Sequence, residues 1–134
     1  MRRRKEKNVA RPTDLELAIL RVLWKRGHGS VREILHDYNR GRDEAAGYTT
    51  ILKMLQIMTE KGLVERDDSM RPQIYRTSQS QDQTQRQLVS DLLEKAFEGS
   101  AKQLVMQALS AKAASEKELA EVERVLDRLE VEKK

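Results

Sequence analysis

The chain has 134 residues, of which 36% are charged and 4% aromatic, and it contains no cysteine. This length allows one ordinary domain, or one small domain with a dimerising extension, and excludes two large independent cores. The missing cysteine excludes disulfides, thiolate metal ligands and cysteine nucleophiles, and the composition is typical of a helix-rich globular protein.

Positive charge is concentrated in the first part of the chain. Residues 1–78 contain seventeen Lys/Arg and eleven Asp/Glu, whereas residues 79–134 contain nine and eleven. The first part is therefore the candidate for an anionic partner. No segment approaches the roughly eighteen apolar residues of a membrane span, and the basic N-terminus lacks the apolar run of a secretory signal. We expect a cytoplasmic protein without membrane insertion.

Residues 1–11 form a basic segment. They carry six Lys/Arg and one Glu, which predicts a disordered arm. Such an arm either orders on DNA or acts as a solubilising tail, and the sequence leaves both open.

The capping-box pattern, in which Glu follows Ser or Thr by three residues, marks three helix starts. It occurs at Thr13, at Ser30 and, in the C-terminal region, at Ser115. Apolar residues then recur at helical spacing, predicting helices over roughly residues 13–26 and 30–38, the first ended by Gly27.

A third helix is predicted from Tyr48 to Lys61, with Gly62 as its left-handed cap. Rotation by about 100° per residue separates two faces. The face expected to contact the core carries Tyr48, Ile51, Leu52, Leu55, Met58 and Thr59. The opposite face carries Thr49, Lys53, Gln56, Ile57 and Glu60, with Thr50 at its edge.

Two short strands are predicted next, over residues 63–66 and 73–77, joined by a polar turn over residues 67–72. Three helices followed by a hairpin predict a winged helix-turn-helix domain over residues 12–78. The expected fold class is therefore mainly α with a small β-hairpin, followed by a helical dimerisation region over residues 79–134.

The C-terminal region begins with a Gln-rich stretch, residues 79–87, that is either a linker or the first turns of a long helix. Three amphipathic segments follow, and their apolar stripes are too extensive to be buried against so small a domain. Pairing with a second copy is the simplest solution. The residues expected to form this homodimer are Leu92, Leu93, Phe97, Leu104, Val105, Leu109, Leu119, Val122, Leu126 and Leu129.

The exposed face of the third helix predicts contact with double-stranded DNA. Thr49, Thr50 and Gln56 can donate or accept hydrogen bonds at base edges, and Lys53 can reach guanine or phosphate. The helix N-terminus also favours phosphate oxygens. Three wing arginines are spaced to follow the phosphate backbone, namely Arg66, Arg71 and Arg76.

No pattern in the sequence indicates catalysis. His28 and His36 are the only histidines, and neither has a Ser/Asp pattern or metal-ligand spacing around it. We therefore expect no enzymatic activity, no metal and no cofactor.

Four segments together resemble one known family of regulators. They are TDLELAILRVLW at residues 13–24, VREIL at 31–35, YTTILKML at 48–55 and KGLV at 61–64. In this order they resemble the penicillinase repressors, the BlaI/MecI family of winged-helix regulators. The resemblance covers roughly residues 12–78, and residues 93–129 resemble the family's dimerisation region more loosely.

The resemblance implies a homodimer that binds a palindromic operator and blocks transcription. It implies that Thr49, Thr50 and Lys53 occupy recognition-helix positions and that Arg71 lies on the wing. Members controlled by a membrane sensor protease are cleaved at an Asn-Phe bond, where this chain has Gln107-Ala108. Copper-responsive members carry a cysteine cluster that this chain lacks. The resemblance therefore implies neither inducing mechanism for this chain, and it leaves open whether a sensor protease acts on it.

Two other functions are compatible with the same sequence. A winged helix can dock on a protein instead of DNA, and Glu60 on the candidate DNA face together with the acidic C-terminal half favours that alternative. The dimerising helices can also hold a small-molecule pocket, although the few aromatic residues argue against it.

Overall fold

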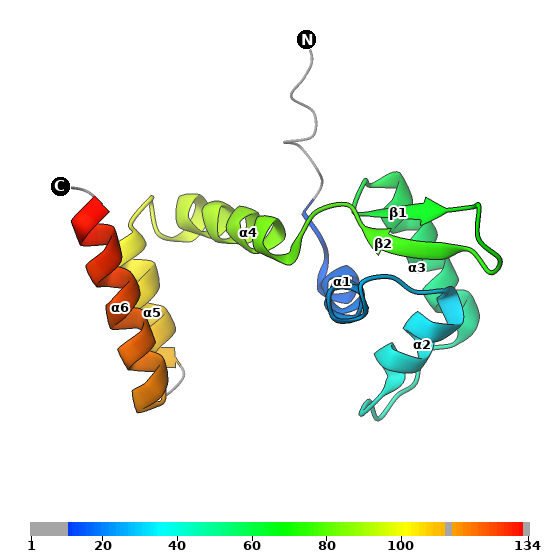
Figure 1. Ribbon diagram of the computed structural model, residues 1–134, viewed down its shortest axis with the longest axis horizontal. Helices are drawn as coiled ribbons and strands as arrows, with labels where there is room; N and C mark the ends of the chain where they lie inside the picture. Colours follow the sequence, from blue (N-terminus) through cyan, green and yellow to red (C-terminus); the bar gives the residue numbers. More distant parts are fainter. Residues whose placement is uncertain (1–10, 112–113, 133–134) are drawn as a thin grey trace, which may run out of the picture. The chain divides into compact units, whose positions relative to one another are not determined.

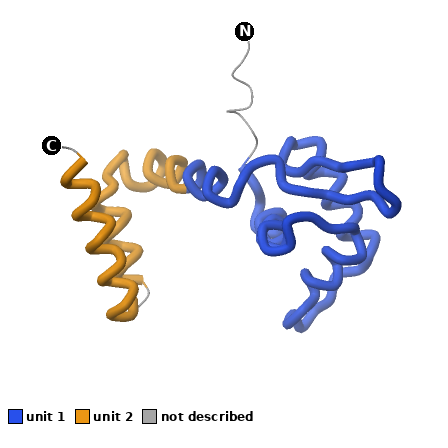
Figure 2. The backbone as a smooth tube through the Cα atoms, viewed as in Figure 1, with its two compact units in different colours: residues 1–88 blue, residues 89–134 orange. Residues whose placement is uncertain are grey.

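The computed structural model describes residues 11–111 and 114–132. They belong to two compact units, Met1–Leu88 and Val89–Lys134 (Figure 2). The predicted basic arm lies outside the described residues except for Arg11. The elements in chain order (Figure 1) are α1 (Asp14–Arg26), α2 (Val31–Asn39), α3 (Tyr48–Glu60), β1 (Val64–Asp67), β2 (Ile74–Thr77), α4 (Gln81–Ala96), α5 (Ala101–Ala111) and α6 (Glu116–Glu132).

The predicted capping box between Ser115 and Glu118 is present at the start of α6, and those at the starts of α1 and α2 are present as well. The Thr13 Oγ1 accepts from the Glu16 N–H at 3.2 Å, and the Glu16 Oε1 accepts from the Thr13 N–H at 3.0 Å. Ser30 and Glu33 make the equivalent pair at 3.2 and 3.0 Å. Reciprocal capping satisfies two backbone donors at each helix start, so both helices begin where the sequence predicted.

The end of α3 is fixed by Gly62. This residue has φ +82°, a conformation that L side chains rarely adopt, and its N–H donates to the Thr59 carbonyl at 3.1 Å. The chain then turns directly into β1. The predicted left-handed cap is confirmed.

The wing is an antiparallel hairpin in which Val64 pairs with Thr77 and Asp67 pairs with Ile74. A further bridge joins Tyr75 to Gly29, whose N–H and carbonyl both bond to the Tyr75 backbone, at 3.0 and 2.8 Å. The segment before α2 therefore attaches to β2 and ties the wing to the helices.

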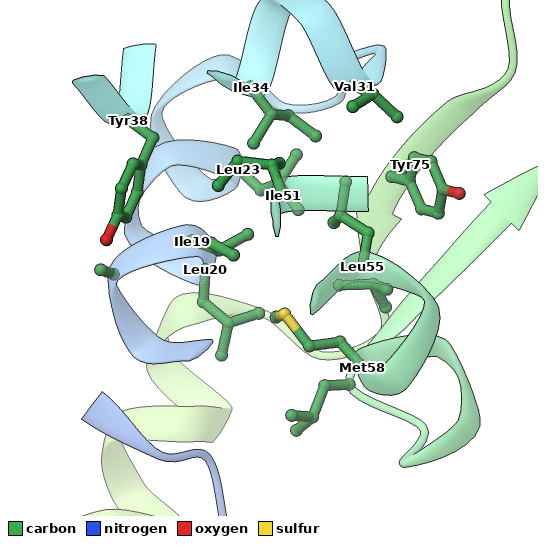
Figure 3. Close-up of a cluster of buried hydrophobic side chains, with 13 residues drawn as sticks. Ile19, Leu20, Leu23, Val31, Ile34, Tyr38, Ile51, Leu55, Met58 and Tyr75 are labelled. Atoms are coloured by element: carbon green, nitrogen blue, oxygen red, sulfur yellow. The ribbon is translucent and has the colours of Figure 1, made fainter. Parts of the chain in front are cut away.

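The helices α1, α2 and α3 and the strands β1 and β2 share one hydrophobic core (Figure 3). Each fully buried apolar side chain contributes about 1.5–3 kcal/mol relative to exposure. The α3 residues of this core are all on the predicted apolar face, so the other face of α3 points away from the core. The most deeply buried members are Ile19, Leu20, Leu23, Ile34, Ile51, Leu55, Met58, Val64 and Tyr75. The first unit therefore has the predicted winged helix-turn-helix fold.

The Gln-rich stretch forms the first turns of α4 and is not a free linker. Ser80 caps this helix: its Oγ accepts from the Gln83 N–H at 3.1 Å, and the Gln83 Oε1 accepts from the Ser80 N–H at 2.9 Å. Thr84, one turn further, is buried with 7% of its surface exposed. The start of α4 therefore packs within the first unit.

The second unit contains the end of α4 together with α5 and α6. Residues of α5 and α6 line a shared groove of about 360 Å³, so these two helices lie side by side (Figure 1). The Gln107-Ala108 bond lies within α5. None of the residues described from position 89 onward is buried. Among the described residues, no helix is both long and apolar enough to cross a membrane.

Candidate nucleic-acid interface

The side chains predicted to read DNA are all exposed. Thr49, Thr50, Lys53 and Gln56 lie on the outward part of α3, and Arg71 lies in the turn of the wing. The first four therefore form one polar surface on one helix, which we call the α3 face. It offers hydroxyl, amide and ammonium groups to a partner, a mixture suited to base edges and phosphates.

The N-terminus of α3 is open. Gly47 occupies the capping position and makes no side-chain hydrogen bond, and the first turn contains no acidic residue. Among the six helices that the structure describes, the other five begin with a Ser or Thr hydroxyl that accepts a backbone hydrogen bond. Free N–H groups and the positive end of the helix dipole favour an anion at this position.

Arg32 adds a cation to this end of α3, a contribution that the sequence patterns did not reveal. Its guanidinium carbon lies 4.9 Å from the centroid of the Tyr48 ring. The prediction that Tyr48 faces the core is wrong: this residue is 41% exposed, because its ring lies against Arg32 of α2 instead of the core residues. A cation on an aromatic ring is held in place while its charge stays available to a phosphate.

The loop before α3 is held by side chains. The Asn39 amide donates to the Ala46 carbonyl at 3.0 Å, and its Oδ1 accepts from the Ala46 N–H at 2.8 Å. Arg42 stacks on the Tyr38 ring at 4.0 Å and donates to the Tyr38 carbonyl at 2.7 Å. Both ends of the loop are therefore anchored, which fixes where α3 begins.

The wing arginines are partly neutralised within the wing itself. The Arg66 Nε lies 2.7 Å from the Asp68 Oδ1, and the Arg76 Nη2 lies 3.7 Å from the Asp67 Oδ2. The Asp68 carboxylate raises the pKa of Arg66, and hydrogen bonds from Ser69 lower the pKa of Asp67.

Arg71 differs from the other two wing arginines. It donates to backbone carbonyls of the turn, at 3.1 Å to Asp68 and 3.5 Å to Met70, and to no carboxylate that the structure describes. Its charge is therefore the least neutralised of the three.

A buried ion pair fixes the C-terminal end of α3 to the start of α1. The Lys61 Nζ lies 2.7 and 3.0 Å from the two Glu16 carboxylate oxygens, and the Glu16 side chain is only 3% exposed. Burial raises the pKa of the Glu16 carboxyl, but Lys61 and the Thr13 N–H outweigh it, so this pKa lies below its ordinary value. The orientation of α3 is thus set at both ends.

A second charged network joins α1 to α2. The Arg26 Nη1 lies 2.9 Å from Asp37, its Nη2 lies 3.3 Å from Glu33, and its Nε donates to the His28 carbonyl at 3.3 Å. The hydrogen bond from Arg26 lowers the pKa of Asp37. These contacts set the crossing of the two helices that support α3.

Groups of acidic, histidine or cysteine side chains that could hold a metal ion do not occur among the described residues. The two histidines, His28 and His36, are exposed. The chemistry that the α3 face offers is hydrogen bonding and charge complementarity.

Comparison with known proteins agrees with the winged helix-turn-helix architecture. No curated protein matches the chain at a significant level. The family described as penicillinase repressor matches residues 12–128, which is most of the chain and includes all the described elements up to the greater part of α6. The chain therefore belongs to the penicillinase repressor family, whose members are DNA-binding transcriptional repressors.

Proposed function

We propose that the protein is a homodimeric repressor that places α3 of each subunit in the major groove of one half-site of a palindromic operator. The observation that carries the proposal is α3 itself. It has an exposed polar face, an uncapped N-terminus without acidic residues, and a cation from α2 beside its first turn. Helix N-termini of this kind bind phosphate, and exposed hydroxyl and amide groups read base edges.

Each residue of the α3 face has a specific role in this proposal. Thr49 and Thr50 lie in the first turn, where their hydroxyls reach base edges and their methyl groups pack on thymine. Lys53 and Gln56 lie one turn further on, where the ammonium binds guanine or phosphate and the amide pairs with adenine. Arg71 and Arg32 bind the backbone on either side.

The second unit supports dimerisation because it has no buried core of its own. Its described residues form amphipathic helices, yet none is buried. A helical unit of this size cannot fold stably with its apolar side chains in water. We therefore expect the second unit of another copy of the chain to cover these side chains. Of the ten predicted dimer residues, the exposed ones are Leu92, Val105, Leu109, Leu119, Leu126 and Leu129, with exposed fractions of 39–54%. The half-buried ones are Leu93, Phe97, Leu104 and Val122.

A band-shift titration on the upstream region of the gene tests operator binding. Thr50→Ala and Lys53→Ala should each weaken operator binding by about 1–3 kcal/mol and should affect competitor DNA much less. The matched control is Lys95→Ala, another exposed lysine, which should leave affinity unchanged. Equal affinity of all variants for the operator would favour docking on a protein instead of DNA.

Sedimentation of the full chain tests the dimer. Leu126→Glu places a charge on the apolar side of α6, and we expect it to yield monomers at micromolar concentration and much weaker operator binding. Arg128→Glu introduces the same residue about 200° around the same helix, by the roughly 100° rotation per residue, and should leave the dimer intact. A Leu126→Glu protein that still sediments as a dimer would contradict the assignment of α6.

A further inference from the structure

A groove of about 670 Å³ lies in the first unit, between α1 and the loop that joins α2 to α3. One wall comes from α1 and contains Arg21, Lys25 and Trp24. The other comes from the end of α2 and the following loop, and it contains Arg40 and Arg42. This volume lies within the range of about 300–1,000 Å³ that small-molecule sites occupy.

The groove is strongly positive. Four cations line it and Asp37 is the one acidic residue in its lining. Asp37 is already compensated by Arg26 at 2.9 Å and by Arg40 at 3.4 Å. Within the part of the chain that the structure describes, Arg21 and Lys25 have no ion-pair partner. One anionic group between the two walls would therefore meet uncompensated positive charge.

The shape of the groove is held by packing and hydrogen bonds. Trp24 packs against the core from the α1 wall. On the opposite wall, Arg42 is fixed on the Tyr38 ring and uses its Nε on the Tyr38 carbonyl, so the rest of its guanidinium stays available. The walls are thus largely formed before any ligand arrives, which lowers the entropic cost of binding.

The indole N–H of Trp24 is a buried donor on a residue that lines the groove. This nitrogen is buried, and no acceptor for it occurs among the described residues. A buried donor without a partner costs about 1–3 kcal/mol. The α1 wall therefore contains a donor for which the described residues supply no acceptor.

The groove is separate from the α3 face. Its lining comes from α1, α2, the loop after α2 and Gln81, and includes no residue of α3, β1 or β2. An operator contacted through α3 and the wing therefore leaves the groove without an assigned partner.

We propose that this groove binds a small organic anion that carries carboxylate or phosphate groups. Its anionic groups lie between Arg21 and Lys25 on one side and Arg40 and Arg42 on the other, and Trp24 covers its less polar part. Because the loop lining the groove leads directly into α3, the ligand contacts the segment that fixes where the α3 face begins.

Trp24 makes the proposal directly measurable, since it is the one tryptophan in the chain. The full-length protein without DNA is titrated with citrate and, separately, with pyrophosphate, and the Trp24 emission is followed at constant ionic strength. We expect a saturable change with at least one probe. Arg21→Ala/Lys25→Ala should raise the apparent Kd at least tenfold, and Arg42→Ala, tested separately, should also raise it.

The matched control is Lys53→Ala/Arg66→Ala, which removes two cations outside the groove and should leave the titration unchanged. A change that does not saturate, that sodium chloride reproduces, or that survives the loss of Arg21 and Lys25 would overturn the proposal. Operator DNA is titrated in a separate experiment. A change of Trp24 emission that DNA produces and that Arg21→Ala/Lys25→Ala removes would also overturn the proposal, because the groove would then be a phosphate contact of the DNA. Because no DNA is present in the citrate and pyrophosphate titrations, failure of operator binding does not affect their outcome.

Discussion

Lys61→Met should destabilise the first unit by removing the cation that compensates a buried carboxylate. The Lys61 Nζ lies 2.7 Å from Glu16, whose side chain is 3% exposed, while the lysine itself is 27% exposed. Breaking a buried ion pair by removing one partner costs about 3–5 kcal/mol. The Thr13 N–H still donates to Glu16 and the site is partly open on the lysine side, so we expect a smaller loss, about 2–3 kcal/mol at pH 7.

The loss should depend on pH in a defined direction. In the native chain the pKa of Glu16 lies below its ordinary value, so the stabilisation it contributes is complete above that ordinary value and is lost as pH falls through the lower, folded value. Without Lys61, only the hydrogen bonds from Thr13 oppose the effect of burial, so we expect the pKa of Glu16 to rise above its value in the native chain. Protonation of Glu16 then removes the uncompensated buried charge in the variant. The difference in the free energy of unfolding between the variant and the native chain should therefore shrink as the pH falls from 7 to about 4.

Urea unfolding followed by Trp24 fluorescence measures this difference, because Trp24 packs against the core of the same unit. Lys53→Met is the matched control: it removes an exposed lysine of α3 and should change the free energy of unfolding by less than about 0.5 kcal/mol. Adding Glu16→Gln should recover part of the loss in the Lys61→Met background. The reasoning would be refuted if Lys61→Met lost no more free energy of unfolding than Lys53→Met, or if its loss did not change with pH.

Three further predictions concern the wing, the cation beside the start of α3 and the loop before α3. Asp68→Asn releases Arg66 from its carboxylate, so it should raise DNA affinity several-fold and steepen the dependence of log affinity on log salt, measured by band shift at several salt concentrations. Arg32→Ala should weaken binding about equally on operator and competitor DNA and reduce the same slope by about 0.9. Asn39→Ala removes both hydrogen bonds to Ala46 and should lower the free energy of unfolding by about 1–3 kcal/mol in urea titration.

Local signals in the sequence predicted most of the fold. The capping boxes at Thr13 and Ser30 gave the starts of α1 and α2, and the period of the apolar residues gave the inner face of α3 around Ile51 and Leu55. These features depend on neighbours three or four positions away, which is the distance that helical geometry makes readable. The start of α4 has a capping box too, between Ser80 and Gln83. The sequence did not single it out, because Gln83 lies among several other glutamines.

The electrostatic details of the candidate site were not predictable in the same way. The Glu16–Lys61 pair joins residues 45 positions apart, and Glu16 had already been assigned to helix capping. The contact of Arg32 with Tyr48 depends on how α2 crosses α3. Periodicity gives the face of a helix on which a residue lies, but it does not give the element that packs beside that face. Pairs between different elements, such as these two, therefore cannot be predicted from periodicity.

At Gly47, the uncapped start of α3, a residue that stabilises the helix would also block the proposed phosphate site. Gly47 has φ −92° and ψ 169°, which other residues adopt freely, and a Cβ added there would meet nothing within 4 Å. Aspartate would therefore fit, cap the helix and complement its dipole, gaining several tenths of a kcal/mol to about 1 kcal/mol of stability. The same carboxylate would occupy the place proposed for a phosphate. If a phosphate binds there as proposed, a search for more stable variants would select against DNA binding at this position, and glycine would keep the start of α3 free for that phosphate.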